Sequence, residues 1–287
     1  MRIHIVTDSN AHFAHPQLMA QYPVTVVPNT LHIAGQAYRE GVDITTEQAL
    51  ELIAHQMTPP QVDPPSVEDY LAVYTHLAGA NDAVISIHAS RVISKSWYNA
   101  RVAAEQMQGA LQMTVIDSRT LDAAQGLVVR AAARVIEATN DLDEVIRVVR
   151  AATERAYAIY YVEDVEYIMR NGLMSPSHAI LSKLHETYPL LTVEDGALLT
   201  IEKVRTRGQA VDRLVDFAIE FVDLEDALIL YHRAYMSEQT RTLQNRLTTE
   251  FEDRHFPHAL YGPALASLIG TEATGLVILE SAWDELE

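Results

Sequence analysis

The sequence contains no cysteine among its 287 residues. This absence excludes disulfide bonds, cysteine nucleophiles and cysteine-ligated zinc sites. No run of 18 apolar residues occurs, so the sequence predicts no membrane-spanning helix and no integral membrane association. The opening segment, Met1–Asp8, reads as a strand that enters a polar loop and lacks the apolar core of a signal peptide. We therefore expect a soluble, cytoplasmic protein.

Positive charge is scarce as well. The chain has 21 lysines and arginines against 39 aspartates and glutamates, which gives a formal net charge of −18. A nucleic-acid partner is disfavoured, because binding to phosphates requires a positively charged surface. Hydrophobic residues make up 48% of the chain, enough for one large domain or two of ordinary size.

Several common catalytic and cofactor motifs are also absent. No Gly-x-Gly-x-x-Gly follows the first strand, so a dinucleotide is not indicated. No Gly-x-Ser-x-Gly elbow occurs, which weakens an esterase interpretation. The 12 histidines show no metal-ligand spacing. We expect neither a metal nor a cofactor.

What is present in the first half is an alternation of strand-like and helix-like segments, which favours a parallel sheet covered by helices. The expected strands are Ile3–Val6, Val24–Val27, Ala83–Ile87 and Thr114–Ile116. The expected helices are Glu47–Gln56, Val67–Leu77, Trp97–Leu111, Ala123–Ala138 and Asp141–Ala156. The proline-rich segment Met57–Pro65 is expected to be a rigid, extended loop.

The second half mixes hairpins with helices and predicts an α+β fold. Glu194-Asp195-Gly196 reads as a hairpin turn, because Asp-Gly suits positive φ. Helices are expected at Gln209–Phe221 and Ser237–Phe251. The fold class is thus α/β with two lobes, and we predict an N-terminal domain at 1–156 and a C-terminal domain at 157–287.

A candidate anion site follows the predicted strand Ala83–Ile87. Ser90, Ser94 and Ser96 supply hydroxyl groups, and Arg91 and Lys95 supply positive charge, directly before the helix that begins near Trp97. The unpaired N–H groups at a helix N-terminus favour a carboxylate or phosphate. The alternative is that the serines do no more than cap the helix.

Polar residues also end two other strands. Asp8 and Ser9 follow the first strand, and Asp117 and Ser118 follow the fourth. Loops at the carboxyl ends of parallel strands can face one crevice. We expect these side chains to bond the backbone of their own loops, as in Asx turns, rather than to form a catalytic pair.

An ordered set of segments along nearly the whole chain resembles the DegV family of bacterial fatty-acid-binding proteins. No single motif is specific, but their order is. The matching segments are Ile5-Val6-Thr7-Asp8-Ser9, Val27-Pro28-Asn29, Tyr38-Arg39-Glu40-Gly41-Val42-Asp43-Ile44, Pro65-Ser66, Ser90–Ala100, Ile116-Asp117-Ser118 with Gly126, Val165-Glu166-Tyr167-Ile168, Asp195-Gly196, Arg205-Thr206-Arg207 and Gly262-Pro263.

This resemblance implies a DegV-like fold with a long-chain fatty acid held between two lobes, and no catalysis by the chain itself. It implies that the acyl group is stored or presented, in known members to a separate fatty acid kinase. By the resemblance the carboxylate would be bound by Ser94, Ser96, Ser66 and Arg205. Lys95 either adds a cationic partner or is a solvated surface charge, and the alternative for Arg205 is a surface salt bridge.

Four positions depart from the family pattern. Val62 stands where the family has a threonine, Lys95 where it has a glycine, Leu173 where it has an arginine and Leu260 where it has a histidine. His258 lies two residues before the last of these. The departures bear on the kinase partnership and not on the fold.

Two other functions remain open at this point. A hydrolase could use Ser94 with a histidine such as His88 as base, and a member with a degenerate ligand site could act as an interaction module. A bound acyl chain would need a wall of apolar side chains. The candidates for that wall are Leu31, Ile33, Ile168, Met169, Leu173, Met174, Ile180, Leu184 and Leu260.

Overall fold

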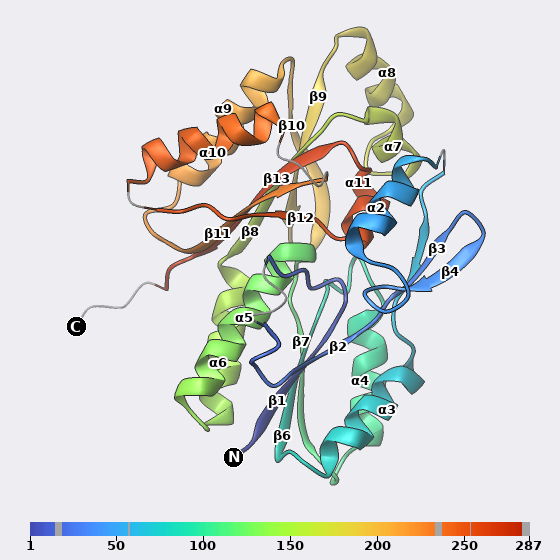
Figure 1. Ribbon diagram of the computed structural model, residues 1–287, viewed down its shortest axis with the longest axis vertical. Helices are drawn as coiled ribbons and strands as arrows, with labels where there is room; N and C mark the ends of the chain where they lie inside the picture. The colour runs from blue at the N-terminus through green and yellow to red at the C-terminus, as the bar shows by residue number, and fades with distance from the viewer. Residues whose placement is uncertain (15–18, 57, 233–236, 253, 283–287) are drawn as a thin grey trace.

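The computed structural model describes residues 1–14, 19–56, 58–232, 237–252 and 254–282. The N-terminal lobe (1–156) is built on a four-stranded sheet of order β2-β1-β6-β7, in which all neighbours are parallel (Figure 1). This confirms the predicted parallel sheet. Its strands are β1 Ile3–Asp8, β2 Val24–Val27, β6 Ala83–His88 and β7 Gln112–Asp117.

Helices cover both faces of this sheet because neighbouring strand residues point to opposite sides. Val6 of β1 packs with Tyr70 and Tyr74 of α3, whereas Ile5 belongs to the core on the α5 side. The helices of this lobe are α2 Thr46–Ala54, α3 Val67–Ala78, α4 Ser96–Gln106, α5 Asp122–Ala138 and α6 Leu142–Glu154. Each helix begins and ends within two residues of a predicted one, except at the end of α4. This helix ends at Gln106, whereas the prediction extended it to Leu111.

A small antiparallel sheet of order β4-β3-β5 carries the proline-rich segment. β5, Gln61–Asp63, is an edge strand, the position where nearby prolines are tolerated. The expected extended conformation is therefore confirmed for Gln61–Asp63, and Met57 lies outside the described residues. The β3–β4 hairpin, Thr30–Ile33 and Gln36–Arg39, turns through Ala34 and Gly35 at positive φ and was not anticipated.

The C-terminal lobe (157–282) contains a six-stranded sheet of order β10-β9-β8-β13-β11-β12. Neighbours are antiparallel except for β11 and β12. The predicted Asp195-Gly196 turn joins β9 to β10, with both residues at positive φ. The elements are β8 Ala156–Val162, α7 Val165–Arg170, α8 Pro176–Leu184, β9 Tyr188–Glu194, β10 Ala197–Val204, α9 Arg207–Ile219, β11 Leu224–Tyr231, α10 Glu238–Glu250, β12 His258–Leu260, α11 Pro263–Ile269 and β13 Ala273–Glu280.

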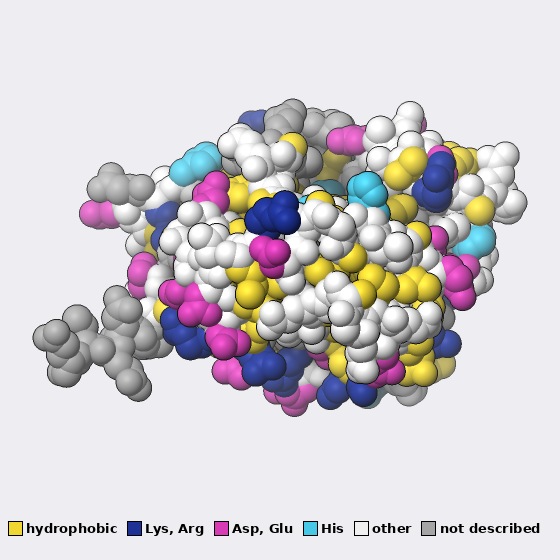
Figure 2. Space-filling view, turned by 90° about the horizontal axis from the view of Figure 1, so that it is seen from below, with side chains coloured by type: hydrophobic (Ala, Val, Ile, Leu, Met, Phe, Trp, Pro, Cys, Tyr) yellow, Lys and Arg dark blue, Asp and Glu magenta, His cyan; other side chains and the backbone are white. Residues whose placement is uncertain are grey.

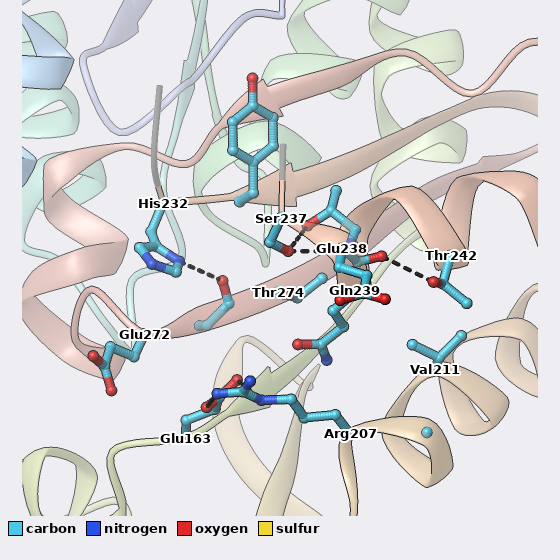
Figure 3. Close-up of a pocket in the computed structure, with 14 residues that line it drawn as sticks. Glu163, Arg207, Val211, His232, Ser237, Glu238, Gln239, Thr242, Glu272 and Thr274 are labelled. Carbon is cyan, nitrogen blue, oxygen red and sulfur yellow. Dashed lines mark hydrogen bonds and ion pairs between the residues drawn. The ribbon is translucent and has the colours of Figure 1, made fainter. Parts of the chain in front are cut away.

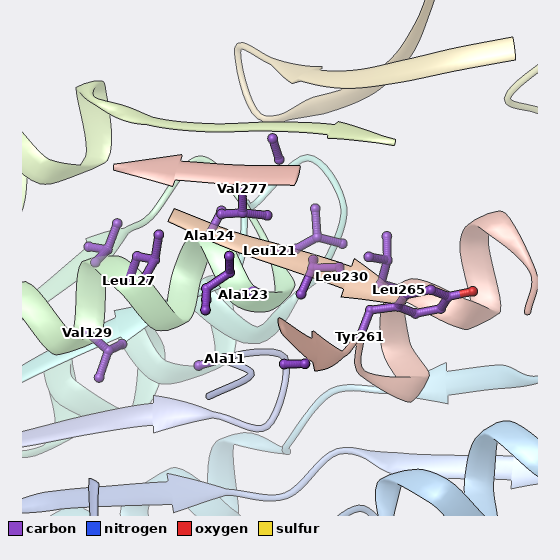
Figure 4. Packing of buried hydrophobic residues seen from close by; sticks show 14 of the residues in the cluster. Ala11, Leu121, Ala123, Ala124, Leu127, Val129, Leu230, Tyr261, Leu265 and Val277 are labelled. Atoms are coloured by element: carbon purple, nitrogen blue, oxygen red, sulfur yellow. The ribbon is translucent and has the colours of Figure 1, made fainter. Parts of the chain in front are cut away.

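Helix α5 lies between the two sheets and joins the lobes. It packs against β1 on one side and against β8 and β13 on the other. Figure 4 shows Leu121, Ala123 and Leu127 on the side that faces Leu230 and Val277 of the larger sheet. We call this continuous apolar cluster the shared core, because its residues come from both lobes. The first strand of the larger sheet, β8, begins at Ala156, one residue before the predicted start of the C-terminal domain, and the domain boundary stays a prediction.

Two glycines mark close backbone approaches at the start of α5. A Cβ on Gly126 would lie 2.0 Å from the carbonyl oxygen of His12, so even alanine would force the segments apart. A Cβ on Gly262 would lie 2.9 Å from Oδ1 of Asp122. The N–H of Gly262 donates to that same oxygen at 2.6 Å, which ties the Gly262-Pro263 turn to α5.

Charges on the surface are mostly mixed in sign. In Figure 2, acidic and basic side chains lie beside each other along the rim of the face seen from below. Among the ion pairs, Arg101 pairs with Glu105, and Arg134 of α5 pairs with Glu225 of β11. Within the described ranges, no helix is both long enough and apolar enough to cross a membrane.

Candidate functional site

The loop between β6 and α4 lies where the two lobes meet. The N–H of Ser90 donates to the carbonyl oxygen of Thr120. Its hydroxyl donates to the carbonyl oxygen of Gly196 at 2.7 Å, in the β9–β10 turn of the C-terminal lobe. The serine-rich loop is thus fixed from both sides and presents the N-terminus of α4 at the junction.

Ser94 is the residue of this loop best placed to bind a ligand. Its Oγ accepts from the N–H of Ser96 at 3.1 Å, so the serine does cap the helix. The hydroxyl proton of Ser94 has no acceptor among the described residues. Ile93 beside it packs against the shared core. Ser94 can therefore donate to an anion whose apolar part enters that core.

Lys95 follows directly and adds a positive charge at the same point. It occupies the N-cap position of α4, is exposed, and forms no ion pair within the described part of the chain. The N–H groups of Trp97 and Tyr98 occupy the first turn, where a helix offers no carbonyl partner. Together these groups form the positive end of a helix next to a free hydroxyl.

Ser66 lies near this helix, but its hydroxyl is already used. Asn99 of α4 donates to the carbonyl oxygen of Pro65 at 2.8 Å, which brings the end of the proline-rich segment to α4. Ser66 caps α3: its Oγ donates to Oδ2 of Asp69 at 2.8 Å and accepts from the Asp69 N–H. It could bind a ligand only by giving up this capping box.

Ser96 is likewise committed to an internal bond. It is fully buried, and its hydroxyl donates to Oδ2 of Asp8 at 2.5 Å, with the hydroxyl of Tyr70 also 2.5 Å away. The structure therefore corrects the expectation that Ser96 is a free donor. The physical reason is burial: a serine sealed beside a carboxylate bonds that carboxylate.

His88 and Asp8 form the centre of this buried polar network. Nδ1 of His88 lies 2.9 Å from Oδ2 of Asp8, and Nε2 lies 2.7 Å from Oγ of Ser86. All three side chains have 0% exposure. A Ser94–His88 pair, which a hydrolase would need, is not formed in the described residues, because both ring nitrogens of His88 face other partners.

Two buried carboxyls at this edge of the sheet have opposite pKa shifts. Burial alone would raise the pKa of Asp8, but hydrogen bonds from His88, Ser96 and Asn10 and the charge of His88 outweigh it and lower the pKa. Burial raises the pKa of Glu40 to about 7, against the lowering effect of hydrogen bonds from Ser9 and Asn29. Glu40 thus binds its proton over most of the acidic range.

Three of the four polar residues at the strand ends make the expected local turns. Oδ1 of Asp8 accepts from the N–H of Asn10 at 3.0 Å, and Oδ1 of Asp117 accepts from the N–H of Arg119 at 2.9 Å. Ser118 bonds the backbone of Thr120. The prediction is confirmed for Asp8, Asp117 and Ser118, although Asp8 also bonds across the sheet. That second role was missed, and the signal was a histidine and an aspartate at the ends of neighbouring strands. The prediction is wrong for Ser9, whose hydroxyl donates to Oε2 of Glu40 at 2.5 Å and accepts from the N–H of Asn29 at 2.8 Å, because both partners lie beside it on the neighbouring β2–β3 and β4 segments.

Arg205 is not brought to the β6–α4 loop. It follows β10, whose other end carries Gly196, the residue that touches Ser90. A strand rises about 3.3 Å per residue, so roughly 25 Å separates Arg205 from that contact. Its side chain is exposed and its N–H donates to Oε1 of Gln209. The resemblance implies that Arg205 binds the carboxylate. In this structure the length of β10 keeps Arg205 away from the β6–α4 loop.

The neighbouring Arg207 lines a separate cavity of about 400 Å³ in the C-terminal lobe (Figure 3). Its Nη2 lies 2.6 Å from Oε2 of Glu163. Figure 3 shows this ion pair across from Ser237 and Gln239 at the start of α10. Because its charge is paired, Arg207 does not replace Arg205 as a partner for an anion at Ser94.

The predicted apolar wall divides into two groups. Most of its members are buried or partly buried in the shared core; they are Leu31, Ile33, Ile168, Met169, Leu173, Met174 and Leu260. Ile180 and Leu184 of α8 are 59% and 73% exposed, so they do not line an interior wall. Helical spacing marks both as one face of α8, but only the tertiary structure shows that this face is uncovered.

Three of the four departures from the family pattern also lie at the shared core. Val62, Leu173 and Leu260 are partly buried hydrophobic residues packed against it. They come from β5, from the segment after α7 and from β12. This side of the junction is therefore apolar, and the candidate anion site is confined to the N-terminus of α4.

Comparison with known proteins gives a consistent result. A family model described as "Uncharacterised protein, DegV family" matches residues 2–281. A DegV domain-containing protein of Caldanaerobacter subterraneus subsp. tengcongensis is 29% identical over 97% of this chain and 99% of its own length. Protein DegV of Bacillus subtilis is 25% identical over 96% of this chain and 98% of its own length.

Solved structures show the same fold. A fatty-acid-binding DegV family protein from Streptococcus agalactiae has a TM-score of 0.87 at 24% identity, covering 98% of this chain and 100% of its own. A DegV family protein from Thermus thermophilus, described by its fatty acid binding, has a TM-score of 0.86 at 23% identity with the same coverage. The Streptococcus pneumoniae Fatty Acid Kinase (Fak) B3 protein, loaded with linoleic acid, has a TM-score of 0.82 at 17% identity, covering 98% of this chain and 100% of its own.

Proposed function

The chain belongs to the DegV family, and on that premise we propose that it binds a long-chain fatty acid between its lobes and stores or presents the acyl group without catalysing a reaction itself. The fatty acid is its ligand, and the proposal includes no other cofactor. The observation that carries the proposal is the position of Ser94, which offers a free hydroxyl at a helix N-terminus next to the shared core.

The carboxylate would be held by the hydroxyl of Ser94, the free N–H groups in the first turn of α4 and the charge of Lys95. Charge-assisted hydrogen bonds of this kind are about twice as strong as neutral ones. Ser66 would join only if its capping box opened. Ser96 would act indirectly, because its bond to Asp8 fixes the position of the helix start.

The acyl chain would enter the shared core past Ile93, among the buried side chains of Leu31, Ile33, Ile168 and Met174. Each buried CH₂ contributes about 0.8 kcal/mol, so a chain of about sixteen carbons supplies roughly 12 kcal/mol before the costs of ordering. A hydrophobic contribution of this size is enough to retain the fatty acid through purification.

A fatty acid kinase is the partner that this function implies. The similarity to the Fak B3 protein supports such a partnership, because that protein shares the fold over 98% of this chain and 100% of its own. The apolar residues at Val62, Leu173 and Leu260 change the surroundings of the headgroup. We propose that any kinase of this protein must therefore recognise a headgroup held from the α4 side alone.

The direct test is the identity of the co-purified ligand. Protein purified from its source should release a long-chain fatty acid on denaturation, detected by mass spectrometry of the extract at close to one molecule per chain. An empty extract together with no uptake of added palmitate would overturn the proposal. Ester hydrolysis that disappears in Ser94→Ala would instead support the hydrolase. The absence of both bound fatty acid and ester hydrolysis would favour an interaction module.

The Ser94→Ala variant should bind a fluorescent fatty acid more weakly at neutral pH. Loss of a hydrogen bond to a charged group costs about 1–3 kcal/mol, and the helix cap contributed by Ser94 is lost as well. Lys95→Gly should also weaken binding if its charge faces the carboxylate. Arg205→Ala is the matched control, since its side chain lies at the far end of β10. Equal affinity in Ser94→Ala and the unmodified protein would place the carboxylate elsewhere.

A further inference from the structure

The turn between β9 and β10 reaches out of the C-terminal lobe and contacts the serine-rich loop of the N-terminal lobe. β9 pairs with β8 only as far as Thr192, so in the sheet residues 193–198 pair only with each other. We call residues 193–198 the hairpin tip. β10 is an edge strand, and its register with β9 shifts between Thr200 and Glu202. Such an irregularity bends a strand, so the hairpin can flex at the base of its tip.

Ser90 is the residue that the hairpin tip contacts. Its side chain is fully buried, and its Oγ donates to the carbonyl oxygen of Gly196 at 2.7 Å. The approach is close, because a Cβ on Gly196 would lie 2.4 Å from that Oγ. The carbonyl oxygen of Ser90 accepts from the N–H groups of Ile93 and Ser94. One residue therefore holds both the tip and the part of the loop that carries Ser94.

A second contact between the tip and the N-terminal lobe is an exposed ion pair. Nη2 of Arg119, in the loop after β7, lies 2.5 Å from Oδ1 of Asp195, and the two side chains are 48% and 87% exposed. An exposed ion pair contributes little to stability and is screened by salt. This contact can therefore break and form again at little cost to the rest of the fold.

The lobes stay joined when these two contacts break. Helix α5 packs against both sheets, and the shared core contains residues of both lobes. Within this buried part of the junction the N–H of Gly262 donates to Oδ1 of Asp122 at 2.6 Å. The hairpin tip has much less buried contact, since only Gly196 and Leu198 of its residues are buried. Local opening can therefore be confined to the tip.

The side chains next to the turn connect the tip to the proposed path of the acyl chain. Leu198 belongs to the shared core, and Val193 packs against it. On the other lobe Ile93, beside Ser94, packs against the same cluster. Lifting the tip would expose the shared core next to the hydroxyl that is proposed to bind the carboxylate. A fatty acid needs such an opening, because its head and its chain lie on either side of Ile93.

We propose that the hairpin tip is a latch, which opens to admit or release the fatty acid and closes over the bound headgroup. This inference rests on the fatty-acid binding proposed above. Ser90 is a positioning residue: its hydroxyl holds the tip and its carbonyl oxygen holds Ser94. Arg119 and Asp195 add a contact that salt weakens. The closed latch slows both uptake and release of the ligand.

The test is the exchange of cis-parinaric acid, a fluorescent long-chain fatty acid. Stopped-flow fluorescence measures its uptake, and a chase with excess palmitate measures its release. Uptake and release should both be at least tenfold faster in Ser90→Ala and at least threefold faster in Arg119→Gln. The affinity should change less than either rate, because an open latch lowers a barrier that uptake and release share.

The matched control is Arg101→Gln, which breaks another exposed ion pair of the N-terminal lobe, with Glu105, and should change neither rate. High salt should narrow the difference between Arg119→Gln and the unmodified protein. Faster release without faster uptake in Ser90→Ala would show that Ser90 only supports the binding loop, and would overturn the proposal.

The absence of cysteine allows the latch to be locked. In the double variant Arg119→Cys and Asp195→Cys, a short bismaleimide should join the two introduced thiols across the gap that the ion pair spans. The cross-linked protein should take up and release cis-parinaric acid at least tenfold more slowly than the same variant treated with a monofunctional maleimide. Equal rates in the two preparations would overturn the proposal.

Opening of the latch can also be measured without a ligand. If the unmodified protein takes up no cis-parinaric acid, the fatty-acid proposal fails separately, and hydrogen exchange then tests the latch. The amides of residues 193–198 should exchange at least threefold faster in Arg119→Gln than in the unmodified protein, whereas those of α5 should not change. Unchanged exchange at the tip would show that Arg119 does not hold it closed, and the latch would be overturned.

Discussion

Replacing His88 with alanine is expected to lower the free energy of unfolding at pH 7 by about 3–5 kcal/mol, the usual cost of removing one partner of a buried pair. The variant leaves the carboxylate of Asp8 fully buried without its bond to Nδ1, which is 2.9 Å long. Bonds from Ser96 and Asn10 remain, but neither replaces the bond to the imidazole ring. Urea unfolding followed by circular dichroism measures the difference.

The pH dependence separates this effect from simple loss of packing. The pKa of Asp8 is lowered in the folded state, so its contribution is present above the unfolded value near 3.8 and is lost as the pH falls through the folded value. The gap between His88→Ala and the unmodified protein should therefore narrow in acid. Tyr74→Phe removes only the bond to Ser86, 2.7 Å long, and should cost about 1 kcal/mol. If His88→Ala lowers the free energy of unfolding by no more than Tyr74→Phe does, the assigned role of the Asp8–His88 pair is contradicted.

Replacing Glu40 with glutamine should stabilise the protein above neutral pH by up to about 3 kcal/mol. Burial raises the pKa of this carboxyl from 4.5 to about 7. Between these two values the folded state binds more protons than the unfolded state, so stability falls as the pH rises. One pKa unit corresponds to about 1.4 kcal/mol, and the cost is complete once the pH exceeds 7. Glutamine has no proton to lose.

The hydrogen bonds of Glu40 survive the substitution. Oε2 accepts from Ser9 at 2.5 Å and from Asn29 at 3.0 Å, and a glutamine carbonyl can accept both. We therefore expect Glu40→Gln to match the unmodified protein at pH 5 and to exceed it at pH 8, measured as free energies of unfolding in urea. Glu137→Gln, at an exposed position, is the control and should change neither value. Identical pH profiles for Glu40→Gln and the unmodified protein would show that Glu40 is ionised at no cost.

Local sequence patterns were sufficient for most elements of the fold. The two central parallel strands, β1 and β6, are short runs rich in β-branched residues and buried on both faces, which makes their hydrophobic pattern easy to recognise. The edge strands β2 and β7 are only partly buried. The Asp195-Gly196 turn needs positive φ, which few other residue pairs tolerate. The β3–β4 hairpin was missed because Ala34 and Gly35 give a weaker turn signal between strands of only four residues.

The candidate site was only half predictable for a different reason. A serine's type and spacing reveal that it has a hydroxyl, but not which neighbour that hydroxyl already bonds. Ser94, Ser96 and Ser66 look alike in sequence, yet only Ser94 keeps its proton free, whereas Ser96 donates to Asp8 and Ser66 to Asp69. Arg205 matched by pattern, and the length of β10 removes it from the loop.

The sequence by itself determined the alternation of strands and helices, the family, and the loop at which a helix N-terminus meets a cluster of serines. Those features depend on interactions between residues that are close in the chain, and the spacing of residue types along the sequence indicates such interactions. Only the tertiary structure decided that Asp8 and His88 pair across 80 residues, that α5 is enclosed between two sheets and that the β9–β10 turn contacts Ser90. Burial and charge at these places arise from contacts between distant segments, which no local pattern specifies.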